Sequence, residues 1–195
     1  MPKLESTMKG FVSFIFVCMY SSVACALEVT LHKEYYRVDP HSVDAIEAAI
    51  ITASTLQSDK NGKAVGQYDA STLVTSFGVE HNDGYCRVNE FELTLNGSLV
   101  LPALSKKRFH AKDIIEAFEQ HKQMIEVHEL QHESIWIEHL QSFEKNVRVL
   151  RVEDNLQCDV LIDDINQKMI NALSEILFEK RAFDCKSYGK ELHLH

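Results

Sequence analysis

The period of the apolar positions changes near the middle of the chain. In the first half, runs that partly alternate and are rich in Val, Thr, Tyr and Phe predict β-strands. These strands cover residues 28–38, 68–79, 85–95 and 99–101, and the Asn96-Gly97 pair between the last two predicts a hairpin turn. One amphipathic helix over residues 42–53 interrupts the strands.

In the second half, the apolar positions recur every three or four residues, which is the period of an α-helix. A predicted helix over 112–150 carries one stripe of apolar and histidine side chains: Ile114, Phe118, His121, Ile125, His128, His132, Ile135 and His139. A second helix over 159–183 should pack back against the first. The pattern therefore predicts an α+β fold, in which an N-terminal antiparallel or mixed sheet with one helix precedes a two-helix half.

The N-terminal segment has the features of a secretory signal peptide. From Met8, a lysine precedes a short apolar run, and small residues follow up to Ala26. We expect translation to start at Met8 and cleavage to follow Ala26, which makes 1–26 the signal segment and 27–195 a single domain. The apolar run is short for a membrane anchor, and the residue three positions before Cys25 disfavours lipidation. The mature protein is thus expected to be secreted or periplasmic, without a stable membrane span.

The net charge of the chain bears on the class of molecule that it can bind. The formal net charge is −9, and residues 1–26 carry +1, so the mature chain is near −10. This balance argues against a nucleic-acid surface.

The mature chain keeps three cysteines, Cys86, Cys158 and Cys185, which in an oxidising compartment predicts one disulfide and one further thiol. The cysteine count alone leaves the pairing open.

A five-residue motif in the first long helix carries the candidate chemistry: His128-Glu129-Leu130-Gln131-His132. Side chains four residues apart lie on one helix face, about 6 Å apart along the axis, so both imidazoles can bind one metal ion. The glutamate between them can take a proton from a water molecule that the metal activates. Because both histidines lie on the stripe that otherwise carries core residues, we expect them to point into the protein. This arrangement is typical of zinc hydrolases.

A catalytic zinc site needs a third protein ligand. His121 and His139 lie about 10 and 16 Å along the helix axis from His128, which is too far for them to share one ion with it. The ligand must therefore come from the second helix or the tail, where the candidates are Asp163, Asp164, Glu175, Asp184, Cys185, Tyr188 and His193. Acidic residues near a helix start often stabilise only the helix dipole, which weakens the first two candidates.

Short segments along the mature chain accompany the motif. They are Tyr35-Tyr36-x-Val38, Gly66-x-Tyr68-x-Ala70-x-Thr72, Cys86-Arg87-Val88, Leu101-Pro102, Cys158, and Phe183-Asp184 followed by Ser187-Tyr188-Gly189. Together with the motif they resemble a bacterial family of predicted secreted zinc-dependent proteases, otherwise of unknown function. The resemblance implies a zincin-like catalytic half in which His128 and His132 bind Zn²⁺ and Glu129 is the general base.

The same resemblance implies two further assignments. It pairs Cys86 with Cys158 in a disulfide and leaves Cys185 over. It also points to Tyr188 as the third zinc ligand, because the histidine near the end of the family pattern corresponds to a position near Tyr188 in this chain. Tyrosine is a less common zinc ligand than histidine, so this departure bears on turnover more than on metal binding.

These features predict an exported zinc-dependent peptidase that acts on a peptide or protein substrate. Tyr188 or His139 is a candidate for stabilising the oxyanion, and by analogy with zincins the strand at 85–95 is a candidate platform for an extended substrate. The same chemistry would serve an amidase that acts on cell-wall peptides. The alternative function is a catalytically impaired, exported zinc-binding module that acts through a cell-envelope partner.

Overall fold

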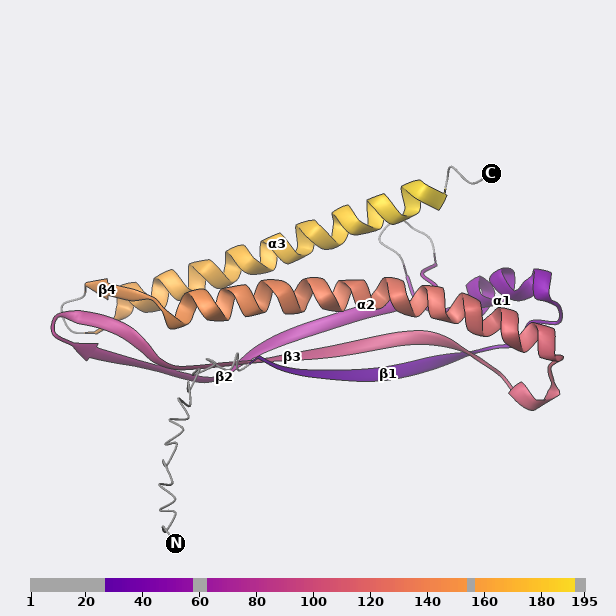
Figure 1. Cartoon of the computed structure of the whole chain (residues 1–195), viewed down its shortest axis with the longest axis horizontal. Coiled ribbons are helices and arrows are strands. Elements are labelled where there is room, and N and C mark those ends of the chain that lie inside the picture. The colour runs from indigo at the N-terminus through magenta and orange to yellow at the C-terminus, as the bar shows by residue number, and fades with distance from the viewer. Residues whose placement is uncertain (1–26, 58–62, 154–156, 192–195) are drawn as a thin grey trace, which may run out of the picture.

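The computed structural model describes residues 27–57, 63–153 and 157–191 (Figure 1). Its elements are β1 (Glu28–Val38), α1 (Ile46–Ala53), β2 (Gln67–Asn82), β3 (Tyr85–Leu104), α2 (Lys112–Arg148), β4 (Arg151–Glu153) and α3 (Asp159–Glu191), with short 3₁₀ turns at Val43–Ala45 and Lys107–Phe109. The fold is α+β, and a strand-rich region with one short helix precedes two long helices, as the sequence predicted. The expected signal segment, 1–26, lies outside the described residues.

The strands form one mixed sheet in the order β1-β3-β2, and β4 pairs with the start of β3. β1 runs parallel to β3, whereas β2 and β4 run antiparallel to it. β3 is therefore the central strand. Within the described residues, β2 has a strand neighbour on one side only, so its other edge is open.

The hairpin predicted at Asn96-Gly97 is wrong, because β3 continues without a turn over its 20 residues. Gly97 serves a close contact instead. A Cβ at this position would lie 2.7 Å from the Oη atom of Tyr68, so glycine is what lets that ring lie against the strand. Pro102 lies two residues beyond Val100, where the pairing with β2 ends, so it has a strand partner only on the β1 side, opposite Tyr36, and such a position tolerates a residue without an N–H.

The two long helices stack on the sheet in layers. α2, with 37 residues, lies along one face of the sheet, and α3 runs back along α2 (Figure 1). Buried side chains from the central strand, α2 and α3 form the core between them: Phe91, Leu93, Leu95, Leu99, Leu101, Trp136, Leu140, Phe143, Leu161 and Ile176. Removal of this apolar surface from water is the main term that holds the layers together.

The histidine stripe predicted on α2 is at least half-buried at all eight positions. The helix also buries a second side toward the sheet, where Trp136, Leu140 and Glu129 lie. The period of the sequence indicated only the first of these two buried sides. The second is what brings Glu129 close to the start of β2.

Two features of the described residues bear on the predicted export. A disulfide joins Cys86 at the start of β3 to Cys158 just before α3, with Cα atoms 5.5 Å apart, so the pairing implied by the resemblance is confirmed. Cys185 is a free, exposed thiol. The disulfide is consistent with export to an oxidising compartment. None of the described helices combines the length and the apolar character that a membrane crossing requires.

Candidate metal centre

The two motif histidines lie in the middle of α2 and point toward α3. Their rings are 5.2 Å apart between centroids and nearly perpendicular, at 85°. The His132 side chain is 7 % exposed and that of His128 is 22 % exposed. The expectation that both imidazoles face the interior of the protein is confirmed, more fully for His132.

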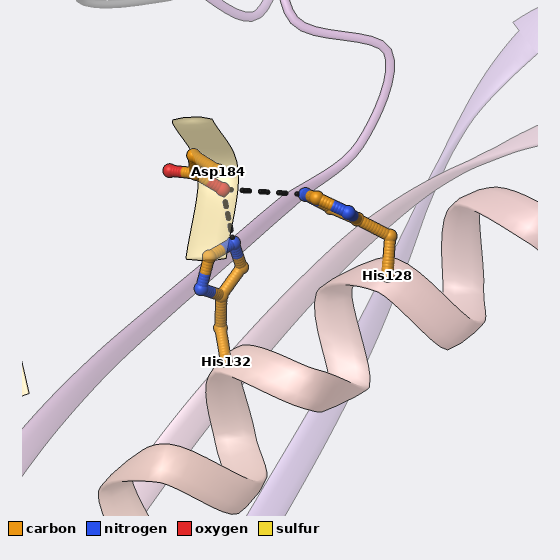
Figure 2. A group of neighbouring side chains, drawn as sticks. All are labelled: His128, His132 and Asp184. Atoms are coloured by element: carbon orange, nitrogen blue, oxygen red, sulfur yellow. Dashed lines mark ion pairs between the residues drawn. The ribbon is translucent and has the colours of Figure 1, made fainter. Parts of the chain in front are cut away.

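Asp184 of α3 meets both imidazoles (Figure 2). Its Oδ1 atom lies 3.3 Å from Nε2 of His128 and 3.0 Å from Nε2 of His132. One ligand atom from each of the three residues lies within 4.8 Å of the others. The two helices thus bring an aspartate and the motif histidines to a single point.

Two of the three separations among these atoms fit a zinc ion, and the third, between the two histidines, is at most 4.8 Å. Zinc bonds of about 2.0–2.1 Å in a tetrahedral site place the ligand atoms about 3.3 Å from one another. The distances from Asp184 to His128 and His132, 3.3 and 3.0 Å, match that separation. Two imidazoles and one carboxylate also form a donor set that catalytic zinc takes, with a fourth position left for water.

The other third-ligand candidates lie elsewhere or outside the described side chains. Within the described residues, His128, His132 and Asp184 are the one group of three His, Cys, Asp or Glu residues close enough to hold a metal ion. Tyr188 belongs to α3, but its side chain lies outside the described residues, as does all of His193. The assignment of Tyr188 therefore stays a prediction, whereas the distances from Asp184 to the two histidines make Asp184 a candidate for the third metal ligand.

The remaining histidines of the stripe have other partners. His139 has Nε2 at 2.7 Å from a carboxylate oxygen of Glu179, and its Nδ1 is 3.6 Å from Glu175. His121 has Nδ1 at 2.9 Å from the carbonyl oxygen of Ala117. Both therefore have polar partners away from the motif, and those of His139 join α2 to α3.

Glu129 lies on the sheet side of α2, against the first residues of β2. It is 8 % exposed, and the backbone N–H of Tyr68 donates a hydrogen bond to its carboxylate. Burial raises the pKa of Glu129 to about 7, and the charge of Asp184 acts in the same direction, whereas the Tyr68 N–H and Lys180 oppose the shift. A carboxyl group with a pKa near neutrality is well suited to general base catalysis.

His132 has the properties of a neutral ligand. Burial lowers its pKa; the positive charges of Lys180 and His128 act in the same direction, and Asp184 opposes them. A neutral imidazole is the form that binds a metal ion. The influence of Lys180 on both Glu129 and His132 was not predicted from the sequence. Its position one helical turn before Asp184 becomes informative only once Asp184 is placed at the site.

Gly66 allows the approach of the chain to Glu129. A Cβ at this buried position would lie 2.4 Å from Cγ2 of Ile125 and 3.0 Å from Oε1 of Glu129. We expect Gly66→Ala to lower the free energy of unfolding by about 1–3 kcal/mol in urea denaturation, because the side chains it meets are held between α2 and the sheet. At Gly78, an added Cβ meets chiefly the end of the exposed Asn89 side chain.

Gly78→Ala is therefore the matched control, since Asn89 can turn away into solvent. An equal or larger loss of stability in Gly78→Ala than in Gly66→Ala would contradict a tight contact between the start of β2 and Glu129.

Comparison with known proteins places the chain in a family. A family model described as a bacterial protein of unknown function (DUF922) matches residues 33–190, so the chain belongs to this family. Neither the curated proteins nor the solved structures include a match to the chain. The family carries no established activity.

Proposed function

We propose that this protein is an exported zinc-dependent peptidase. His128, His132 and Asp184 are the metal ligands, with Asp184 in place of Tyr188, and Glu129 is the general base. The observation that carries the proposal is the convergence of three ligand atoms from α2 and α3, with the buried glutamate of the motif near enough for the charge of Asp184 to act on it. A pair of core histidines alone would not require a buried carboxyl group and a second carboxylate, Asp184, around it.

The residues of the site divide the chemistry among themselves. A bound zinc ion supplies Lewis acidity, which activates a water molecule and polarises the scissile carbonyl. Glu129 accepts the proton of the attacking water and passes it to the leaving amine. The backbone N–H of Tyr68 holds the carboxylate in place, and the charge of Lys180 lowers its proton affinity. Burial of Glu129 and His132 limits competing water around them.

The open edge of β2 is the better candidate for the substrate platform. The stretch 85–95 of β3 pairs with β2 along its length, and β4 and β1 cover its two ends on the other side. β2 has an open edge, and its first residues contact Glu129. An extended peptide added to this edge would form backbone hydrogen bonds and pass near the base.

The alternative is an exported zinc-binding module without turnover that acts through a cell-envelope partner. Its main support was the replacement of a histidine by Tyr188 in the family pattern. Asp184 on the same helix offers a ligand atom in place of that histidine, which weakens this support. The disulfide and the predicted signal segment favour export for either function.

The mature protein from Leu27 tests the proposal through its metal content and its hydrolysis of peptides. We expect one zinc per chain by elemental mass spectrometry and cleavage of an internally quenched peptide library. EDTA should abolish the cleavage, and added zinc should restore it. Bound zinc without cleavage would favour the module. Absence of zinc after reconstitution would mean that Asp184 only forms ion pairs with two core histidines.

A further inference from the structure

Phe183 lies next to Asp184 in α3 and contacts both motif histidines. Its ring centroid is 4.9 Å from that of His128, with the planes tilted by 31°, and 5.3 Å from that of His132, with the planes at 88°. The two imidazole centroids are 5.2 Å apart. The three rings therefore form a closed triangle in which each touches the other two.

His132 depends on such packing for its orientation. In metal sites, the nitrogen that does not bind the metal is usually held by a hydrogen bond, which fixes the ring. Nδ1 of His132 is buried and has no hydrogen-bond partner in the part of the chain that the structure describes. The His132 side chain is 7 % exposed, and its ring contacts the ring of Phe183. Contacts with neighbouring side chains, and not a hydrogen bond to Nδ1, therefore restrain the orientation of the His132 ring.

Asp184 and Phe183 approach the histidines from different directions. Adjacent residues of a helix point about 100° apart. The carboxylate of Asp184 meets the Nε2 atoms, while the ring of Phe183 packs on the flat and edge surfaces of the imidazoles. One short stretch of α3 therefore both supplies a ligand atom and restrains the rings that carry the other two.

We propose that Phe183 is a positioning residue of the metal centre: its aromatic ring holds the imidazoles of His128 and His132 in the orientation that binds the ion. The inference rests on the metal site of the proposed function. It predicts an effect of Phe183 on metal affinity that exceeds its contribution to packing. Groups that orient metal ligands typically change metal affinity by about 10- to 100-fold.

The test compares zinc affinity and cobalt spectra of Phe183 variants of the mature protein. Zinc affinity is measured by competition with a chelator, and the visible absorption of bound Co²⁺ reports ligand geometry. We expect Phe183→Met, which keeps apolar bulk but lacks a ring, to weaken zinc binding by about tenfold or more and to alter the cobalt spectrum. Phe183→Tyr keeps the ring and should retain both properties.

Leu173→Ala is the control for packing. Leu173 is a partly buried residue of α3 in the same hydrophobic cluster as Phe183, and its truncation should lower stability and leave metal affinity unchanged. Wild-type affinity in Phe183→Met, or equal weakening in Leu173→Ala, would overturn the positioning role. A wild-type protein that binds neither zinc nor cobalt would overturn the metal site itself, and the inference with it.

Discussion

A Glu129→Gln variant is expected to keep its zinc and to lose peptide hydrolysis by about 100-fold or more. The amide has nearly the shape of the carboxyl group, so the contacts with Gly66 and the start of β2 can persist. It cannot accept the proton of the attacking water. The measurement is kcat/KM on a peptide substrate selected with the wild-type protein, together with zinc content by elemental mass spectrometry.

Glu133→Gln is the matched control for this variant. Glu133 follows Glu129 by one turn of α2 and is half-buried, and burial raises the pKa of its carboxyl group. Glu133 is not one of the three residues whose ligand atoms converge. We expect near wild-type hydrolysis from it. Wild-type hydrolysis by Glu129→Gln would end the assignment of the base, whatever the metal content.

The first part of the site followed from local spacing alone. Residues 128 and 132 lie on one helix face wherever the helix packs, so the histidine pair and its intervening glutamate were predictable. The proposed third ligand, Asp184, was one of seven candidates and could not be singled out, because it reaches the pair only through the register in which α3 packs against α2. That register depends on side chains from several elements, such as Leu140 and Ile176, which the sequence does not relate to one another.

The errors in the sheet have a similar origin. Asn96-Gly97 is a strong local turn signal, but the contact of Gly97 with Tyr68 on another strand requires the glycine for a different reason. β3 is central because it also pairs in parallel with β1, and such a long-range contact cannot be predicted from a local sequence pattern. The strand considered as a platform by analogy is therefore central, whereas β1 and β2 are the edge strands of the described sheet, and β2 is the one whose first residues contact Glu129.

The burial of Glu129 also required the tertiary structure. The stripe of period 3.6 indicated one buried side of α2, and Glu129 lies on the other. Only the packing around that second side buries the carboxyl group and raises its pKa to about 7. The motif thus identified Glu129, and the packing raises its pKa, which suits the carboxyl group to its proposed role as general base.

Asp184→Asn is expected to weaken zinc binding by more than about 100-fold, a larger effect than loss of a group that only orients a ligand. The amide keeps the size of the side chain and its oxygen, but it loses the negative charge that zinc favours in a ligand. Chelator competition measures the affinity. Thermal unfolding offers a second readout, since zinc at 100 times the dissociation constant stabilises the wild type by about 2.7 kcal/mol.

Two further variants decide between the candidates on α3. Glu175→Gln removes a carboxylate of the same helix that contacts His139, and it should leave zinc affinity unchanged. Tyr188→Phe should do the same if Asp184 is the ligand, because Tyr188 lies one turn, about 6 Å, farther along the helix axis. Loss of zinc in Tyr188→Phe with retention in Asp184→Asn would reverse the assignment. It would mean that the C-terminal end of α3 approaches the histidines more closely than the contact with Asp184 implies.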